Sequence, residues 1–269
     1  MSVAFEPVSI GRKTAQLTIT AGPVVFTIDL VGTALEFQRV GVFAFFASGG
    51  GWKTTLTLEN GSSFATKAHI TFHPDAGSFA PVLPGTIAGQ VDVTINPGGS
   101  YMFDAELTSA AVTTGWLDIT AGGPLTGYEI FRWHSSGNPD METTVMMDTD
   151  TSSTANVLIP FDETAGFHTA IATISVGPGN PNGGYFGTIA TDADGHLIAQ
   201  NLYGSGGPSG RAYFAADLAN LFSDHGDFSS IRGRRGFIEL AAGTSAIALR
   251  FNSSGSFTSL PIARSNHQP

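Results

Sequence analysis

The chain has 269 residues, of which 42% are hydrophobic and 13% charged, and its formal net charge is −10. Twelve Lys and Arg residues against 22 Asp and Glu residues argue against a nucleic-acid partner, because phosphate neutralisation needs clustered cations. The absence of cysteine excludes disulfides, thiolate chemistry and cysteine-ligated zinc, and no apolar run is long enough to span a membrane.

Abundant turn residues favour an all-β fold. Gly (34) and Pro (14) are frequent, which suits short strands joined by tight turns. The first residues show no basic segment followed by an apolar core, so the chain as given carries no signal peptide. Either the protein is intracellular or its natural beginning lies upstream, and the N-terminal segment favours the second interpretation.

Residues 1–36 are predicted to form an N-terminal β-hairpin. Ala15, Leu17 and Ile19 alternate with polar neighbours, a turn falls at residues 21–23, and a second strand covers residues 24–31. The pattern A-x-L-x-I, followed by a strand ending in L-x-G-T, resembles the closing hairpin of immunoglobulin-like domains of the abnormal-spindle and hydin type. That resemblance implies the setting of a bacterial surface protein.

An isolated hairpin is only marginally stable in water, so this segment needs a partner. Three arrangements satisfy that need: packing on the following domain, strand exchange with another chain, or membership of a truncated domain. The sequence leaves the three open.

Residues 37–137 are predicted to form a first β-sandwich. In the segment WKTTLTLE, Trp52 and Leu56 fall on one face and Lys53 and Thr55 on the other, which is strict period-two alternation. Asn60-Gly61 predicts a tight turn. Further strands are expected at residues 68–72, 91–95, 101–107, 115–120 and 125–133, and their regular spacing is typical of an antiparallel sandwich.

Residues 155–263 repeat this order and are predicted to form a second sandwich. The corresponding positions are Trp52 with Phe167, Phe103 with Phe214, Gly115-Trp116 with Gly236-Phe237, and Arg132 with Arg250. Aromatic residues mostly stay aromatic, so the duplication mainly preserves core packing. The predicted fold is therefore two tandem antiparallel Ig-like β-sandwiches with an extra N-terminal β-hairpin.

Three further segments complete the predicted organisation. Residues 138–154 are acidic and Thr-rich, which indicates an exposed connection or edge strand. Residues 264–269 are expected to form a tail. Residues 215–222 (AADLANLF) are too short a segment to decide between an inserted helix and other structure.

The segments GGGWKT (49–54), PGGS (97–100), GWLDIT (115–120) and FTSLP (257–261) together carry a second resemblance. Over residues 40–262 the chain resembles a paired β-module of secreted and surface proteins of acidobacteria and related bacteria. The resemblance implies this architecture and an exported setting, and it implies no catalytic residues.

Asp192, Asp194 and His196 form the most metal-like string in the sequence. A calcium loop needs more oxygen ligands at alternate positions and a later bidentate acid, so a polar hairpin turn is the better interpretation. His69 and His73 would lie on one strand face about 13 Å apart at roughly 3.3 Å per residue, too far to share an ion, and are expected to face solvent. A solvated loop is likewise favoured over a cation site for the acids of the connection, namely Asp140, Glu142, Asp148 and Asp150.

The sequence carries no motif of a catalytic site. HExxH, GxSxG and GxGxxG are all absent, and GSGGPSG (204–210) is most simply a loop. The arginines at 232, 234 and 235 are expected in a turn or strand start. A pair of catalytic carboxylates is not excluded by sequence, because their separation depends on the fold. We expect no enzymatic activity, catalytic residue, cofactor or metal ion.

Aromatic residues give the strongest hint of binding. Trp52 and Trp133, the latter near Tyr128 and Phe131, could form platforms for sugar rings. Core packing is favoured for Trp52 and Trp116, because the second copy has Phe at both positions, whereas the role of Trp133 stays open.

The sequence thus favours a non-enzymatic, extracellular or cell-surface bacterial protein with a structural or adhesive role. Its N-terminal strands would form a homo-oligomer by strand addition. The alternative hypothesis is a carbohydrate-binding module of a secreted multidomain protein, with a polysaccharide as partner.

Overall fold

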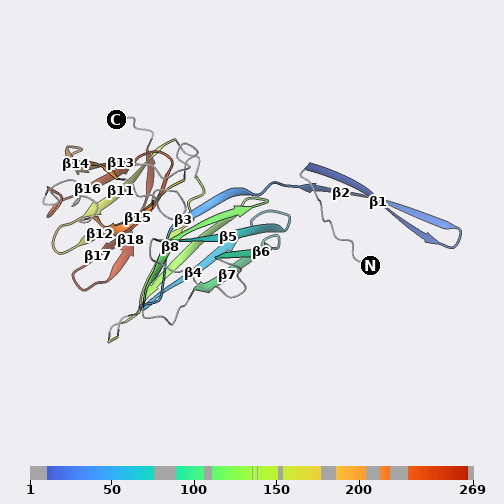
Figure 1. Cartoon of the computed structure of the whole chain (residues 1–269), viewed down its shortest axis with the longest axis horizontal. Helices are drawn as coiled ribbons and strands as arrows, with labels where there is room; N and C mark the ends of the chain where they lie inside the picture. The colour runs from blue at the N-terminus through green and yellow to red at the C-terminus, as the bar shows by residue number, and fades with distance from the viewer. Residues whose placement is uncertain are drawn as a thin grey trace.

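The computed structural model describes residues 11–75, 89–105, 111–134, 136–137, 139–150, 154–176, 186–203, 213–218 and 230–265. In this part of the chain the fold is built from antiparallel strands, which confirms the predicted all-β class. Figure 1 shows a two-stranded arm projecting from one end of a β-sandwich, with a second sandwich on the other side.

The arm is the predicted hairpin. Strands β1 (Gly11–Ala21) and β2 (Val24–Ala34) pair in an unbroken register from Gly11 opposite Ala34 to Ala21 opposite Val24. The two-residue turn between them places Gly22 at a φ of 62°, a conformation that glycine adopts without steric cost. At the base of the arm, the ring of Phe37 stacks on His69 with 4.2 Å between centroids.

Eight strands form the first sandwich. They are β3 (Gln38–Ser48), β4 (Trp52–Glu59), β5 (Thr66–Pro74), β6 (Gln90–Ile95), β7 (Ser100–Ala105), β8 (Thr113–Ala121), β9 (Thr126–Trp133) and β10 (Met141–Met146). One sheet has the order β3-β8-β5-β6 and the other the order β10-β9-β4-β7. Their facing sides enclose an apolar core that includes Phe43, Leu56 and Ile119.

Nine strands form the second sandwich. They are β11 (Asn156–Asp162), β12 (His168–Ser175), β13 (Phe186–Asp192), β14 (Leu197–Tyr203), β15 (Tyr213–Asp217), β16 (Arg235–Leu240), β17 (Thr244–Phe251), β18 (Phe257–Ser259) and β19 (Ala263–Ser265). The sheets have the orders β14-β13-β16-β11-β19 and β15-β12-β17-β18. Apart from β19, strand for strand this is the topology of the first sandwich, as the duplication predicted. Each repeat has eight strands, whereas immunoglobulin constant-type domains have seven in the order ABED and CFG.

One predicted segment agrees with the structure and one predicted turn does not. The predicted connection contributes the edge strand β10, one of the two alternatives expected for it, in which Thr143 and Val145 are buried and alternate with exposed residues. Asn60-Gly61 does not form a hairpin turn, since β4 and β5 lie in different sheets and the Asn60 side chain instead donates to carbonyl groups at Phe64 and Ile95.

One C-terminal prediction needs correction, and the structure describes the start of a segment that the sequence left undecided. The predicted tail contributes Arg264 and Ser265 to strand β19, which pairs with β11. The segment 215–222 begins in strand β15, not in a helix, and residues 219–222 lie outside the described residues.

The pairing of residues across neighbouring strands shows which positions of the two copies are structurally equivalent, and so tests the correspondences predicted from the sequence. Trp52 and Phe167 are equivalent, because each donates its backbone N–H to the carbonyl three residues earlier, at 2.9 Å in both cases. The proposed Arg132–Arg250 correspondence is wrong by one residue, since Arg132 lies opposite Lys53 on the outer face whereas Arg250 lies opposite Thr169. A slip of one residue reverses the face of a strand.

The Phe103–Phe214 correspondence is shifted by two residues. Phe103 lies opposite Leu56, whereas Phe214 lies opposite Thr173, so that Phe214 matches Tyr101 in the ladder. A shift of two residues leaves the face unchanged.

Gly115 and Gly236 occupy equivalent strand positions and share a steric role. A Cβ at Gly115 would lie 2.2 Å from the carbonyl oxygen of His73, and one at Gly236 would lie 1.9 Å from that of Thr191. Both glycines are therefore required by the close approach of the neighbouring strand, which explains why the Gly-aromatic pair recurs.

The two sandwiches pack on each other through a buried apolar cluster, which we call the junction. Its residues come from both sandwiches and include Val42, Ala44 and Trp116 of the first and Ile174, Ile247 and Leu249 of the second. Polar contacts border it: Arg39 donates to the carbonyl of Val176 at 3.0 Å, and Arg264 pairs with Asp148 at 2.6 Å. Each sandwich thus has its own apolar core, and a third apolar cluster, the junction, lies between the two sandwiches.

Candidate functional site

A row of aromatic rings runs along the junction. Trp133 lies 6.2 Å from Trp52, Trp52 lies 5.4 Å from Phe257, and Phe257 lies 5.4 Å from Phe251, measured between ring centroids. Phe251 stacks in turn on His168 at 5.0 Å. The row joins the start of β4 to the end of β17, so it depends on the way the two copies pack.

Beside this row, the two sandwiches enclose a cleft of about 400 Å³. Phe45 and Trp52 line it from the first sandwich, and Phe251 lines it from the second. Its carboxylates are Asp75, whose backbone N–H donates to the Thr114 carbonyl at 2.9 Å, and Asp217 at the end of β15. Asp217 also faces His168 across 4.0 Å.

Of the three tryptophans, Trp116 is buried and Trp52 and Trp133 are half-buried. Trp116 is 2% exposed and stacks on His73 with 3.9 Å between centroids, in agreement with the predicted packing role. Trp52 and Trp133 are half-buried and contact each other within the junction. A carbohydrate-binding row of exposed rings would need a different arrangement.

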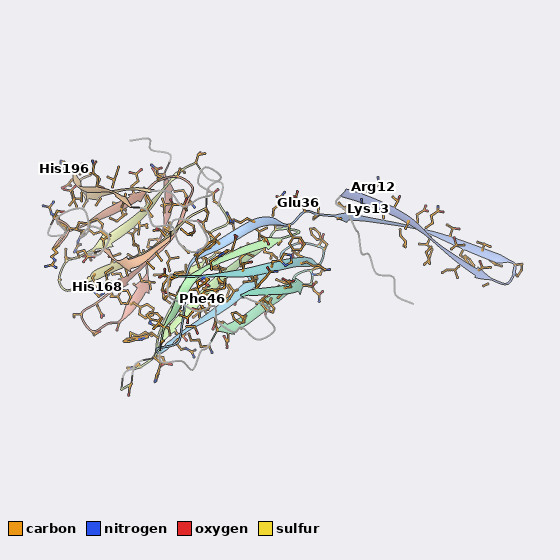
Figure 2. All side chains as sticks on the ribbon, viewed as in Figure 1. Arg12, Lys13, Glu36, Phe46, His168 and His196 are labelled. Atoms are coloured by element: carbon orange, nitrogen blue, oxygen red, sulfur yellow. The ribbon has the colours of Figure 1, made fainter. Side chains whose placement is uncertain are left out.

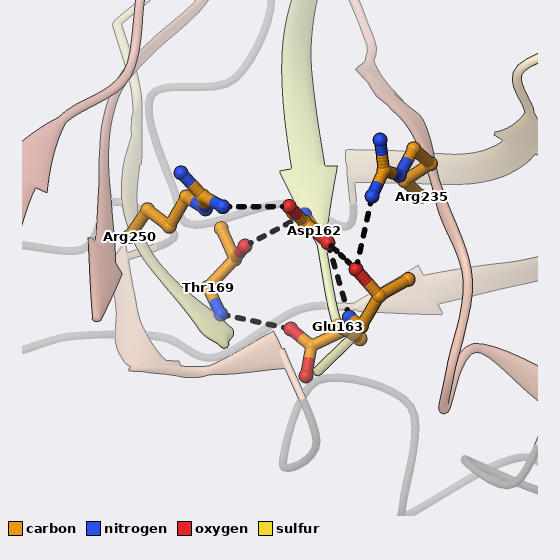
Figure 3. Close-up of polar contacts among 6 residues, drawn as sticks. Asp162, Glu163, Thr169, Arg235 and Arg250 are labelled. Atoms are coloured by element: carbon orange, nitrogen blue, oxygen red, sulfur yellow. Dashed lines mark hydrogen bonds and ion pairs between the residues drawn. The ribbon is translucent and has the colours of Figure 1, made fainter. Parts of the chain in front are cut away.

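A polar cluster surrounds the turn between β11 and β12 (Figure 3). Arg250 pairs with Asp162 at 2.8 Å, and the hydroxyl of Thr164 donates to the same carboxylate at 2.5 Å. Arg235 donates to the Thr164 hydroxyl at 3.2 Å. Arg250 also lies over the Phe167 ring, 3.6 Å from its centroid. The cluster therefore links strands β11, β16 and β17.

Two acids of this cluster have shifted pKa values. Burial raises the pKa of Glu163 to about 7, with further contributions in the same direction from Asp217 and Asp162, although the carboxylate accepts the Thr169 backbone N–H at 2.8 Å. Burial would also raise the pKa of Asp162, but hydrogen bonds from Thr164 and the charge of Arg250 outweigh it, so that pKa lies below its ordinary value. Glu163 can therefore exchange a proton near neutral pH. Its hydrogen bond with the Thr169 backbone stabilises the turn between β11 and β12.

Asp192, Asp194 and His196 lie in the hairpin turn between β13 and β14, as predicted. Their ligand atoms lie within 4.8 Å of one another. The Asp192 carboxylate accepts the backbone N–H groups of Asp194 and His196, at 3.0 and 2.9 Å, and faces the His196 ring at 3.4 Å. These contacts account for the three residues as parts of a turn.

Among the described residues, the other histidines form no group with this turn that could hold a metal ion. His69 contacts Asp92 at 2.6 Å and stacks on Phe37, whereas His73 stacks on Trp116. Figure 2 shows His168 and His196 at opposite ends of the second sandwich. His225, His267 and the loop 204–210 lie outside the described residues.

Cations accompany several acids of the predicted connection. Glu142 pairs with Arg132 and Asp148 with Arg264, while Asp140 faces His134 at 2.6 Å. Glu142 and Asp148 therefore belong to ion pairs of the folded structure, which corrects the expectation of a solvated loop for these two acids. The three arginines near residue 233 fit their prediction: Arg232 and Arg234 are exposed in a turn, and Arg235 begins β16.

The arm presents an apolar face that the described residues leave largely uncovered. Cross-strand partners place its members on one side: Ala15, Leu17, Ile19, Ala21, Val24, Phe26, Ile28 and Leu30. Val24 and Ile28 are each 47% exposed and Phe26 57%. The opposite face is mainly polar. The alternation in the sequence predicted this pattern, but the exposure of the face depends on the fold.

Two features were not predicted from the sequence: the buried carboxyl group of Glu129 and the apolar outer face of β17. Glu129 is 0% exposed, and neither carboxylate oxygen has a hydrogen-bond partner in the described part of the chain. In β17 the run SAIAL is buried on both faces, a pattern that indicates a strand covered from two sides. This run is the sequence feature from which contact between the two sandwiches could have been predicted.

No helix in the described part of the chain is long and apolar enough to cross a membrane. No family model, curated protein or solved structure matches the chain. The fold and the side-chain arrangement are therefore the basis for a functional proposal.

Proposed function

We propose that this protein is a structural or adhesive building block of the bacterial cell surface or extracellular matrix, and that it assembles through its N-terminal arm. The observation that carries the proposal is the apolar face of β1 and β2, on which Phe26 is 57% exposed. A continuous apolar patch of this kind on a soluble protein marks an interaction surface.

The partner that this face fits best is the arm of a second copy. The face is formed by two strands in regular register, so two such faces can pack against each other across a two-fold axis and exclude water from both. The outer edges of β1 and β2 also lack strand partners among the described residues, and open edges accept strands from other chains.

Light scattering of the full chain across a concentration series tests the proposal. We expect dimers or larger assemblies for the unmodified chain and monomers for Phe26→Asp, which places a charge on the apolar face. The matched control is Thr27→Asp, on the polar face one residue along the same strand, which should assemble like the unmodified chain. A chain that is monomeric at every concentration, or equal behaviour of the two variants, would contradict the proposal.

A carbohydrate-binding module remains the second hypothesis and has less support. The observation in its favour is that Trp133 stays half-buried, with part of its ring surface open beside Trp52. Retention on insoluble polysaccharides, compared between the unmodified chain and Trp133→Ala, tests it. No retention on any glycan would count against it.

A further inference from the structure

The junction cleft is a concave site between the two sandwiches, whereas the assembly surface of the arm is an exposed apolar face of β1 and β2. Its volume of about 400 Å³ falls within the roughly 300–1,000 Å³ typical of small-molecule sites, which also occur preferentially between domains. Both copies contribute to its walls, so a bound molecule would contact the two sandwiches at once.

The charges that line the cleft are of one sign. Asp75 from the first sandwich and Asp217 from the second line it, and the described lining includes no Lys or Arg. His168 faces Asp217 across 4.0 Å. Two carboxylates on a chain of net charge −10 favour a cationic ligand.

The remaining lining fits an apolar body attached to that cation. Phe45, Trp52 and Phe251 present aromatic rings, and ring faces attract ammonium groups within about 6 Å of their centroids. Ala172 and Leu249 add aliphatic surface.

We propose that the junction cleft binds an organic ammonium ion, with its charged group beside Asp75 and Asp217 and its apolar body among Phe45, Trp52 and Phe251. The interaction combines charge-assisted hydrogen bonds with cation–π contacts and apolar burial. Such a ligand would also hold the two sandwiches together, because each supplies one carboxylate.

Ligand-observed NMR titration of the full chain tests this at pH 8 and low salt, with 2-phenylethylammonium as probe and 2-phenylethanol as its neutral counterpart. We expect saturable binding of the ammonium probe and affinity about tenfold lower for the alcohol, the loss of roughly one charge-assisted contact. Asp217→Asn should weaken binding of the ammonium probe by a similar factor. Asp194→Asn, the same change in an exposed turn of the same sandwich, should leave it unchanged.

Three outcomes would overturn the proposal. They are equal affinity for the ammonium and the alcohol, equal affinity of the Asp217→Asn and Asp194→Asn variants for the ammonium, and absence of saturable binding of the ammonium to the unmodified chain. None of these outcomes bears on assembly through the arm, which involves other residues.

Discussion

At the scale of single residues, Glu129 is a buried carboxyl group without a hydrogen-bond partner among the described residues. It faces the core of the first sandwich opposite Leu56, and the ladders place Ala248 at the equivalent position of the second copy, opposite Ile171. Burial raises its pKa well above the ordinary value. This burial was not predictable from the sequence, because a single Glu in an alternating strand has the same pattern whichever face it occupies.

Replacement of Glu129 by an apolar residue is expected to stabilise the protein. Glu129→Leu should raise the free energy of unfolding at pH 8 by about 1–3 kcal/mol, because it removes a buried carboxyl group without hydrogen-bond partners. Urea denaturation measures the difference. A loss of stability in this variant would mean that the carboxyl group has a stabilising partner.

The same residue should make stability depend on pH. A carboxyl group whose pKa is raised by folding contributes stability that is present below its ordinary pKa and lost as the pH rises through the folded value. Glu129→Gln cannot titrate, so its unfolding free energy should fall less than that of the unmodified chain between about pH 5 and pH 8. Parallel pH profiles for the two proteins would contradict this assignment.

Glycine at the shared Gly-aromatic pair is expected to be irreplaceable. Gly236→Ala should cost more than about 2 kcal/mol, because its Cβ would lie 1.9 Å from the Thr191 carbonyl oxygen. Gly61→Ala is the matched control, since a Cβ there meets no atom within 4 Å, and it should change stability by less than about 1 kcal/mol. Thermal denaturation of the two variants gives the comparison, and similar losses would be inconsistent with the steric explanation.

At the scale of strands, the two copies differ most on one outer sheet face. The second copy presents Ala170, Leu249 and Phe251 to the junction, whereas the ladders place Thr55, Ile130 and Arg132 at the equivalent positions of the first copy. Period-two alternation placed Lys53 and Thr55 on the outer face of β4, where both are half-buried, but Thr57 on the same face is 2% exposed. The packing between the copies was not predictable by comparing aligned residues, because it joins faces that are not equivalent.

Trp116 and Phe237 give a direct comparison of equivalent positions inside and outside the junction. Trp116 is 2% exposed and Phe237 46% exposed. Trp116→Ala should therefore cost about 3–5 kcal/mol and Phe237→Ala less than about 1 kcal/mol. Chemical denaturation followed by circular dichroism measures both. Equal costs would show that the second sandwich does not cover Trp116.

At the scale of the whole molecule, the duplication produces one body of two sandwiches and an arm that lies apart from it. The sequence predicted the hairpin, the two-copy organisation and six strands of the first sandwich, since these depend on local alternation and turn residues. It did not predict the cleft, whose lining includes residues of β3, β4, β8, β12, β15 and β17 that meet only when the sandwiches pack. A ligand site between two domains depends on tertiary contacts, which cannot be predicted from local patterns in the sequence.

Shared apolar packing predicts that the two sandwiches unfold together. Because the junction buries side chains from both, calorimetry should show a single transition, with the calorimetric enthalpy of unfolding equal to the van't Hoff value. Two resolved transitions would indicate that each sandwich is stable without the junction.

The central claim, assembly through the arm, is tested most directly by amide hydrogen exchange at increasing protein concentration. We expect the amides of residues 11–34 to exchange more slowly as concentration rises, because association covers the apolar face and open edges of β1 and β2. The amides of the sandwich cores should show no such dependence. Exchange in the arm that is equally fast at every concentration would contradict the account.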